Sequence, residues 1–374
     1  MVAFPTVSRT DNTALMDYAA QRLQAAGARI TRVPYESGRD NLYAVVGPQE
    51  SAPVILSGHT DVVPVEGQAW TTPPFELTSA DGRLYGRGTA DMKGFLACAI
   101  VAAEKAAARG LRTPLALALS CDEEVGCLGV RPLIDMVKTV AGKPLLVIVG
   151  EPTELAVATG HKGKTALRAT FTGREGHSAL APHALNALHL AADFLQAIRQ
   201  KQAGIAAEGQ RDGDYDVPYT TLHAGKLAGG VALNIVPNHA VLDFEIRALA
   251  EDDMPGMIEE LREDAARIVN ATDDEDAAIS IEPSFSYPGL ATRNPSHAVD
   301  FVKRLSGANG TIKVAYGTEG GLFAEELGAP VVVCGPGSMA QGHRPDEFVS
   351  EDQLARCDHM LAALVDRLEE GLDA

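Results

Sequence analysis

Residues 53–61 read PVILSGHTD, a short apolar run that ends in a glycine, a histidine and an aspartate. Short, nearly continuous apolar runs are typical of parallel strands buried on both faces. Helical stretches such as the alanine-rich 95–108 separate this run from others of the same kind. Those others are 115–120 (LALALS), 145–149 (LLVIV) and 330–334 (PVVVC). The pattern predicts an α/β fold with a doubly wound, mainly parallel sheet.

The middle of the chain follows a different pattern, with alternating strands and two longer helices. The expected strands are 165–172, 217–223, 240–246 and 278–285, and the expected helices are 184–200 and 254–269. Their order is β-α-β-β-α-β, which is typical of a ferredoxin-like antiparallel α+β unit. We therefore predict one α/β domain, residues 1–163 and 290–374, interrupted by an inserted α+β domain, residues 164–289.

The composition argues against several classes of partner. The 374 residues include 32 Lys+Arg and 50 Asp+Glu, a formal net charge of −18, which repels nucleic-acid phosphates and anionic lipid. No apolar run approaches the roughly 18 residues of a membrane helix, and the N-terminus has no secretory signal. The five cysteines form no CxxC pair and predict reduced thiols in a cytoplasmic protein. We expect neither a nucleic-acid nor a membrane partner.

Polar side chains follow each apolar run, at the edge where open α/β sheets bind their ligands. Asp91 is expected at the same edge, at the start of the 95–108 helix, and His343 follows the last run in a loop. So many carboxylates would repel one another unless a cation lay between them. Imidazole and carboxylate ligands suit Zn²⁺, Co²⁺ or Mn²⁺, and their number suits two ions. The set is His59, Asp61, Asp91, Glu123, Glu124, Glu151 and His343.

Each of these residues also has a plainer interpretation. A histidine after a strand is usually structural, adjacent glutamates usually lie on the surface, and Asp91 alone is typical of a helix N-cap. In extended chain, however, Asp61 faces the same way as His59 and could accept its second ring N–H. Glu123 and Glu124 point to opposite sides, so one could bind metal while the other acts as a general base.

Six motifs make the chain resemble a known family over essentially its whole length. They are SGHTDVVPV (57–65), GRLYGRGTADMKGF (82–95), DEEVGCLG (122–129), VGEPTEL (149–155), GREGHSALAP (173–182) and GHRPDEFV (342–349). In this order they are similar to the dinuclear zinc amidohydrolase and peptidase family, which includes acetylornithine deacetylase, succinyl-diaminopimelate desuccinylase, aminoacylase and carboxypeptidase G. The resemblance implies two bound Zn²⁺ (or Co²⁺) ions and a homodimer formed through the inserted domain.

The resemblance also implies how the ligands divide between the two ions. His59 and Glu151 would bind one ion, and Glu124 and His343 would bind the other. Asp91 would bridge both ions.

Three further residues would take part in the reaction. Glu123 would be the general base, and Asp61 would orient the first histidine. His177 would reach into the partner subunit's site and stabilise the oxyanion. The alternative for His177 is a helix-capping or surface histidine.

The expected substrate is a small N-acyl amino acid whose free carboxylate needs a clamp. The resemblance points to Asn234 and Arg247 for that clamp, although Arg247 could equally form an ion pair on its strand. Thr318 and Lys162 are further candidates for substrate binding. Glu319 would suit a cationic substrate side chain.

Several stretches, among them 160–182 and 316–349, resemble the acetylornithine deacetylase branch most closely. That implies hydrolysis of N2-acetyl-L-ornithine to L-ornithine and acetate, a step of arginine biosynthesis. The alternatives within the family are a succinyl-diaminopimelate desuccinylase, an aminoacylase or a carboxypeptidase G-like enzyme. Outside enzymology, the alternatives are a binding protein that has lost catalysis and a structural dimer.

Overall fold

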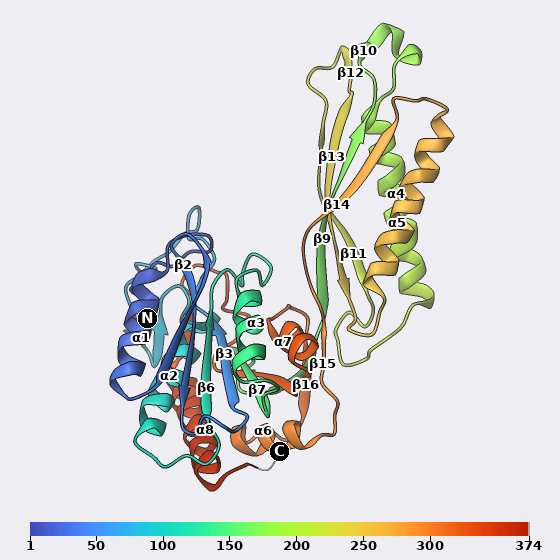
Figure 1. The fold of residues 1–374 in the computed structure, drawn as a ribbon. Helices are drawn as coiled ribbons and strands as arrows, with labels where there is room; N and C mark the ends of the chain where they lie inside the picture. Colours follow the sequence, from blue (N-terminus) through green and yellow to red (C-terminus); the bar gives the residue numbers. More distant parts are fainter. Residues whose placement is uncertain (373–374) are drawn as a thin grey trace. The chain divides into compact units, whose positions relative to one another are not determined.

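The computed structural model describes residues 1–372, and the chain divides into two compact units (Figure 1). Unit 1 contains Met1–His161 and Leu290–Ala374, and unit 2 contains Lys162–Gly289. Each unit has a hydrophobic core of its own. No helix among residues 1–372 is long and apolar enough to cross a membrane.

Unit 1 is built on a nine-stranded sheet with the order β1-β2-β6-β3-β7-β17-β8-β15, in which β16 also pairs with β8. Its four central strands pair in parallel and are buried along their whole length. They are β3 (Val54–His59), β6 (Leu115–Ser120), β7 (Leu146–Pro152) and β17 (Val331–Gly335). These are the four apolar runs of the sequence, and the prediction of an α/β fold with a doubly wound sheet is confirmed.

The outer strands of this sheet are mostly antiparallel, which the apolar runs did not indicate. The hairpin β1–β2 adds antiparallel to β6 on one side, and β8 adds antiparallel to β17 on the other. Their bounds are β1 (Arg29–Glu36), β2 (Arg39–Val46), β8 (Val157–His161), β15 (Leu290–Ala291) and β16 (Thr311–Val314). A small second sheet contains β4 (Thr78–Ala80), β5 (Arg83–Tyr85) and β18 (Phe348–Ser350).

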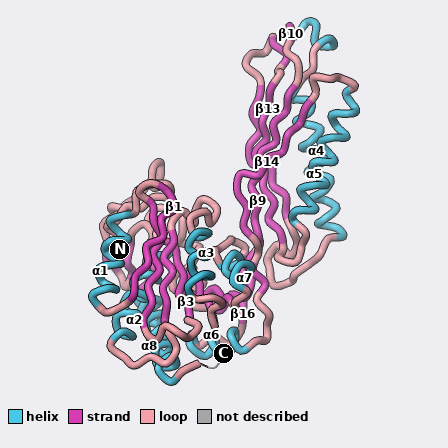
Figure 2. Tube along the Cα trace, viewed as in Figure 1, coloured by secondary structure: helices cyan, strands magenta, loops and turns pink. Residues whose placement is uncertain are grey.

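Helices cover both faces of the large sheet (Figure 2). Four of them pack together into one core layer, because α2 contacts both α1 and α8, and α8 contacts α6. The other two, α3 and α7, pack against each other. Their bounds are α1 (Thr13–Ala25), α2 (Gly94–Ala107), α3 (Val130–Val140), α6 (His297–Ser306), α7 (Gly320–Leu327) and α8 (Glu351–Glu370). All five cysteines are buried and free.

Unit 2 is a four-stranded antiparallel sheet, β11-β13-β9-β14, with helices α4 and α5 packed against it. The elements are β9 (Gly163–Thr172), α4 (Ala187–Glu208), β11 (Thr221–Gly229), β13 (His239–Ala248), α5 (Met254–Thr272) and β14 (Ala278–Tyr287). This β-α-β-β-α-β order confirms the ferredoxin-like prediction. The predicted strand 217–223 starts and ends earlier than β11, and its early end falls just before a register shift at Ala224–Lys226, which interrupts the alternation by which a strand is recognised.

The first and last strands of unit 2 meet at glycines. A Cβ atom on Gly163 would lie 2.7 Å from the backbone nitrogen of Gly289, so no larger residue fits without a shift of the backbone. Lys164 of β9 pairs with Tyr287 of β14 immediately beyond them. In unit 1, Leu290 pairs in turn with His161. The two passages of chain therefore run side by side at this point.

Candidate metal centre

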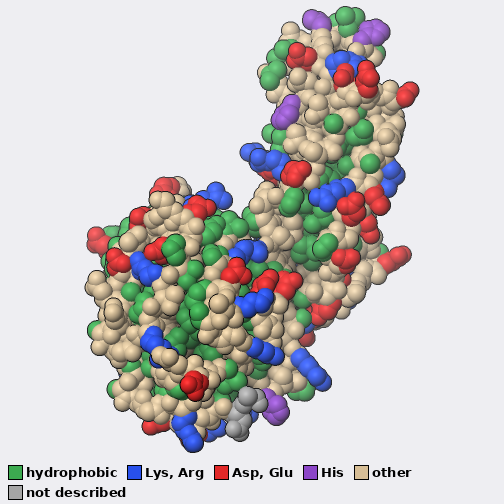
Figure 3. Space-filling view, in the orientation of Figure 1, with side chains coloured by type: hydrophobic (Ala, Val, Ile, Leu, Met, Phe, Trp, Pro, Cys, Tyr) green, Lys and Arg blue, Asp and Glu red, His purple; other side chains and the backbone are tan. Residues whose placement is uncertain are grey.

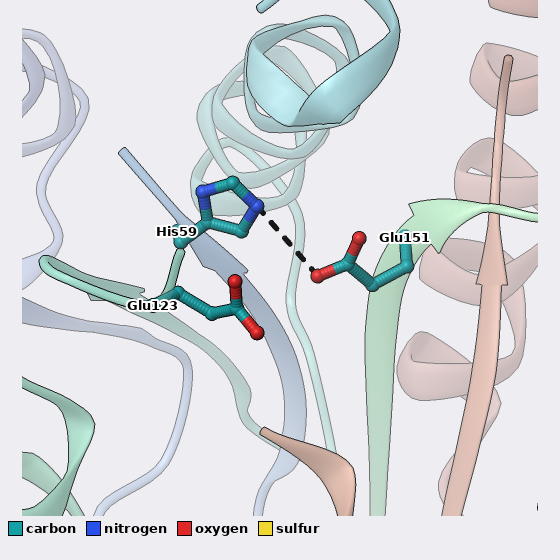
Figure 4. A group of neighbouring side chains, drawn as sticks. All are labelled: His59, Glu123 and Glu151. Carbon is teal, nitrogen blue, oxygen red and sulfur yellow. Dashed lines mark ion pairs between the residues drawn. The ribbon is translucent and has the colours of Figure 1, made fainter. Parts of the chain in front are cut away.

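The polar residues expected at the sheet edge of unit 1 do come together there. His59 is the last residue of β3, Glu151 lies near the end of β7, and the Glu123–Glu124 pair follows β6. Figure 4 shows that the carboxylates of Glu123 and Glu151 both point to the space beside the His59 ring. Among the described residues, the possible ligand atoms form two groups, and within each group the atoms lie within 4.8 Å of one another. One group is His59, Glu123 and Glu151, and the other is His59, Asp91 and Glu124.

The ring of His59 is fixed by the backbone. Its Nδ1 lies 2.8 Å from the backbone carbonyl oxygen of Asp61, which can only accept, so Nδ1 carries a proton. Its Nε2 is directed at carboxylates, 3.0 Å from Asp91 Oδ1 and 3.6 Å from Glu151 Oε1. The ring is 1% exposed. Nε2 is therefore the atom of this ring that is placed to bind a metal.

Asp91 stands between two imidazoles. One carboxylate oxygen, Oδ1, faces His59, and the other, Oδ2, lies 3.1 Å from His343 Nε2. His343 Nε2 is also 3.0 Å from Glu124 Oε2. This is the arrangement of a carboxylate that bridges two ions. The N-cap interpretation of Asp91 is wrong, because Asp91 lies in an irregular turn (Thr89–Lys93) and α2 begins only at Gly94.

The electrostatics of the cluster fit a cation. Burial among like charges raises the pKa of Glu151 well above its ordinary value and that of Glu124 to about 7. Although burial opposes it, hydrogen bonding to His343 and His59 holds the pKa of Asp91 below its usual range. Contact with Asp91 and Glu124 raises the pKa of His343 to about 10. The carboxylates therefore demand positive charge, and imidazole and carboxylate donors suit divalent zinc or cobalt.

Glu123 and Glu124 diverge as expected. Glu124 faces His343, whereas Glu123 faces His59 and accepts a hydrogen bond from the Cys127 thiol at 3.2 Å. Burial is the main cause that raises the pKa of Glu123 well above its ordinary value. Cys127 was not among the predicted residues, because a thiol within an apolar turn has no distinctive spacing.

Asp61 has a different contact from the one expected. Its carboxylate oxygen Oδ1 lies 3.7 Å from His59 Nδ1, beyond hydrogen-bond distance. Instead, Oδ1 accepts the backbone N–H of Glu123 at 3.1 Å, and Oδ2 accepts the backbone N–H of Glu124 at 3.3 Å and the Ser8 hydroxyl at 2.8 Å. The carboxylate thus holds the glutamate turn, while the backbone carbonyl of the same residue orients His59.

Two of the predicted residues lie together in unit 2. His177 of β10 (Gly176–His177) pairs with Ile235 of β12 (Ile235–Val236), and the N–H of Ser178 donates to the carbonyl of Asn234 at 3.0 Å. His177 is exposed, and its Nδ1 accepts the N–H of Ala179 at 3.1 Å. The ring is therefore a helix cap, as the alternative interpretation held, and in its neutral form the free Nε2 carries the proton.

Other candidates for substrate binding have their polar groups engaged. Arg247 donates to Glu245 at 2.8 Å on the same face of β13, as the ion-pair alternative predicted. Lys162 is 5% exposed, and its ammonium donates to the carbonyls of Val217 and Tyr219. Thr318 is fully buried and accepts the N–H of Gly320 at 2.9 Å. The substrate-binding roles of Lys162 and Thr318 stay predictions.

Glu319 is buried as well. It is 1% exposed and accepts a hydrogen bond from the Ser57 hydroxyl at 3.3 Å. Burial is the main cause that raises its pKa to about 7. The pairing of this buried carboxylate with a cationic substrate group stays a prediction.

Comparison with known proteins adds independent findings. Residues 55–367 match the model of peptidase family M20/M25/M40. An acetylornithine deacetylase of Myxococcus xanthus is 35% identical over 98% of this chain and 94% of its own length. An acetylornithine deacetylase of Pasteurella multocida is 32% identical over 99% of this chain and 97% of its own length.

Solved structures of similar fold include an M20 family metallo-carboxypeptidase from Sulfolobus solfataricus. Its TM-score is 0.78 at 18% identity, and the likeness covers 99% of this chain and 97% of that one. A dinuclear metal binding peptidase of family M20 from Bacillus subtilis has a TM-score of 0.71 at 14% identity, covering 99% and 96%.

Proposed function

The chain belongs to peptidase family M20/M25/M40, and from that premise we propose that it hydrolyses N2-acetyl-L-ornithine to L-ornithine and acetate. Membership confirms the resemblance predicted from the six motifs and makes the chain a metal-dependent hydrolase. The acetylornithine deacetylases of M. xanthus and P. multocida support the substrate. The observation that carries the metal-dependent chemistry of the proposal is Asp91, whose two oxygens face two different imidazoles at the carboxyl edge of the sheet.

We propose two divalent ions, Zn²⁺ or Co²⁺, as the cofactors. His59 and Glu151 would hold one, Glu124 and His343 the other, and Asp91 both. When bound, such ions polarise a carbonyl and lower the pKa of water. The nearest contacts among these donors, 3.0 to 3.6 Å, support this assignment.

In the proposed reaction Glu123 moves the proton. Its carboxylate accepts a proton from the water that attacks the amide carbon, and then gives it to the leaving nitrogen as the C–N bond breaks. The products are a carboxylic acid and a free amine, which near neutral pH become a carboxylate and an ammonium ion. The Cys127 thiol and the Asp61 carboxylate hold the residue in place.

The partner subunit's His177 would stabilise the oxyanion of the tetrahedral intermediate. With Nδ1 occupied by the N–H of Ala179, the neutral ring presents an N–H at Nε2, which is the group an oxyanion needs. Asn234 is exposed beside it and is the better candidate for binding the substrate carboxylate. Arg247 would have to exchange Glu245 for that carboxylate.

Apolar surface around His177 supports a homodimer. Leu180, Val231 and Leu233 are 60%, 86% and 101% exposed. In the space-filling view, histidine and hydrophobic side chains lie together at one end of unit 2 (Figure 3). Grouped exposed apolar side chains mark surfaces that another molecule covers. A second copy of the chain would cover these side chains and receive the histidine.

The test is steady-state hydrolysis by chelated protein and by protein reloaded with Zn²⁺ or Co²⁺. The panel contains N2-acetyl-L-ornithine, N-succinyl-diaminopimelate, N-acetyl-methionine and a pteroyl-glutamate, which represent the predicted activity and its three alternatives within the family. We expect kcat/KM to favour acetylornithine by orders of magnitude. Metal-dependent preference for another substrate would refute the proposed substrate but keep the mechanism. Metal binding without any turnover would favour a binding protein.

A further inference from the structure

Three loops that are distant in sequence meet beside the candidate metal centre, at residues 68–71, 86–91 and 343–347. At their junction lies an ion pair between Arg87 and Glu347, with 2.6 Å between Nη1 and Oε2. Both side chains are only 1% exposed. Burying two charges is costly unless they are paired and bonded further, so such a pair must be built into its surroundings.

The carboxylate of Glu347 also holds the backbone of Asp91. Its second oxygen, Oε1, accepts the N–H of Ala90 at 2.9 Å and the N–H of Asp91 at 3.0 Å. The backbone carbonyl of Glu347 accepts the N–H of Gly86 at 2.9 Å. One side chain therefore fixes the position from which the Asp91 carboxylate extends between the two imidazoles.

The guanidinium of Arg87 continues the network to His343. Its Nη2 donates to Gln68 Oε1 at 2.5 Å, and Nη1 donates to the carbonyl of Arg344 at 3.3 Å. The amide of Gln68 then donates to the backbone carbonyl of His343 at 2.8 Å. The guanidinium also lies over the Trp70 ring, with 5.0 Å between Arg87 Cζ and the ring centroid.

We propose that Gln68, Arg87 and Glu347 form a positioning frame for the ion that Asp91 and His343 would share. The inference rests on the metal centre of the proposed function. None of the three side chains would touch the ion or the substrate. They hold the backbones of two ligands that come from separate loops, so that Asp91 Oδ2 and His343 Nε2 lie 3.1 Å apart. Partners of this kind set metal affinity by orienting the ligands.

The experiment measures Zn²⁺ binding to metal-free protein by calorimetry, with the bound ratio checked by elemental analysis. The variants are Gln68→Ala, whose side chain is partly exposed, and Glu347→Gln. Gln21→Ala, an exposed glutamine on α1, is the matched control. We expect two ions per chain in the parent protein. The ion shared by Asp91 and His343 should bind about 10-fold more weakly in Gln68→Ala, while the binding of the other ion is unchanged. In Glu347→Gln it should bind up to about 100-fold more weakly, and the other ion should be weakened less, because Asp91 is the only ligand of that ion that Glu347 holds.

A second readout separates positioning from catalysis. In Gln68→Ala, kcat should return to the parent value at saturating Zn²⁺, because the frame sets occupancy and not proton transfer. Unchanged Zn²⁺ affinity in folded variants would overturn the frame and leave the metal centre intact. An equal loss of affinity for both ions, together with a lowered melting temperature, would also overturn the frame and would indicate a general structural role. A parent protein that binds no Zn²⁺ would overturn the proposed function itself. If Glu347→Gln fails to fold, Gln68→Ala decides the question.

Discussion

Replacing Asp61 separates two ways in which this residue could support the site. In Asp61→Ala, the backbone N–H groups of Glu123 and Glu124 lose their acceptor, as does the Ser8 hydroxyl. A buried donor left without a partner costs about 1–3 kcal/mol, so the two N–H groups together cost about 2–6 kcal/mol. Asp61→Asn keeps one acceptor oxygen and replaces the other with an NH2 donor, so only one of the two backbone N–H groups loses its acceptor, and we expect a smaller loss of about 1–3 kcal/mol.

The orientation of His59 should survive both changes. Its Nδ1–H donates to the backbone carbonyl of residue 61, which no side-chain substitution removes. We therefore expect Zn²⁺ affinity to change little, while the free energy of unfolding falls from the parent through Asp61→Asn to Asp61→Ala. The kcat should fall in the same order, because the turn that carries Glu123 loosens.

Urea unfolding of metal-free protein, followed by circular dichroism, gives the free energies, and calorimetry gives the Zn²⁺ affinity. Asp17→Ala is the control, since its surface ion pair with Arg32 is worth less than about 1 kcal/mol. The reasoning is refuted if Asp61→Ala unfolds like the parent protein while Zn²⁺ affinity collapses. That result would mean that the carboxylate acts through His59 after all.

Three further outcomes are expected. Glu123→Gln should lose about 10²- to 10⁴-fold in kcat while keeping both ions in elemental analysis, and near-normal turnover would exclude Glu123 as the base. Glu319 has a raised pKa of about 7 in the folded chain against 4.5 ordinarily, so its contribution to stability is complete below pH 4.5 and is lost as the pH rises through about 7. The free energy of unfolding in urea should therefore differ between Glu319→Gln and the parent, and this difference should favour the variant by about 3 kcal/mol more at pH 8 than at pH 4.5. The same difference at both pH values would argue against a buried neutral acid. Mixing the inactive Glu123→Gln and His177→Ala proteins should restore about a quarter of the parent activity. Half of the dimers are then mixed, and each mixed dimer has one site with both Glu123 and the partner's His177. Failure to restore activity, despite proven subunit exchange, would place His177 in its own subunit's site.

The sequence was informative where apolar runs end. Four runs predicted the parallel centre of the sheet, and the polar residues after them predicted which side chains would gather at its edge. This worked because burial selects uninterrupted apolar strands, and because parallel strands present their carboxyl ends on one side.

The contacts of individual side chains were not predictable in this way. The sequence shows that Lys162 and Asp61 are charged, but not which backbone groups compete for them, and both bind backbone groups in the structure. The Arg87–Glu347 pair joins residues 260 positions apart, beyond the reach of any local pattern. Thr318 lies in a stretch that resembles the family, and its hydroxyl accepts the N–H of Gly320, the first residue of α7.

The close approach of Gly163 and Gly289 bears on how such a protein can arise. A segment that begins and ends at one point can be gained by a single insertion into a surface loop, without altering the strand order of the host. The host needs only two glycines at the junction, so that the entering and leaving chains fit side by side. An ancestor with a short turn between β8 and β15 could thus have held the metal ligands already. The inserted unit would then have added His177 and Asn234 to a site whose metal ligands already stood in the host.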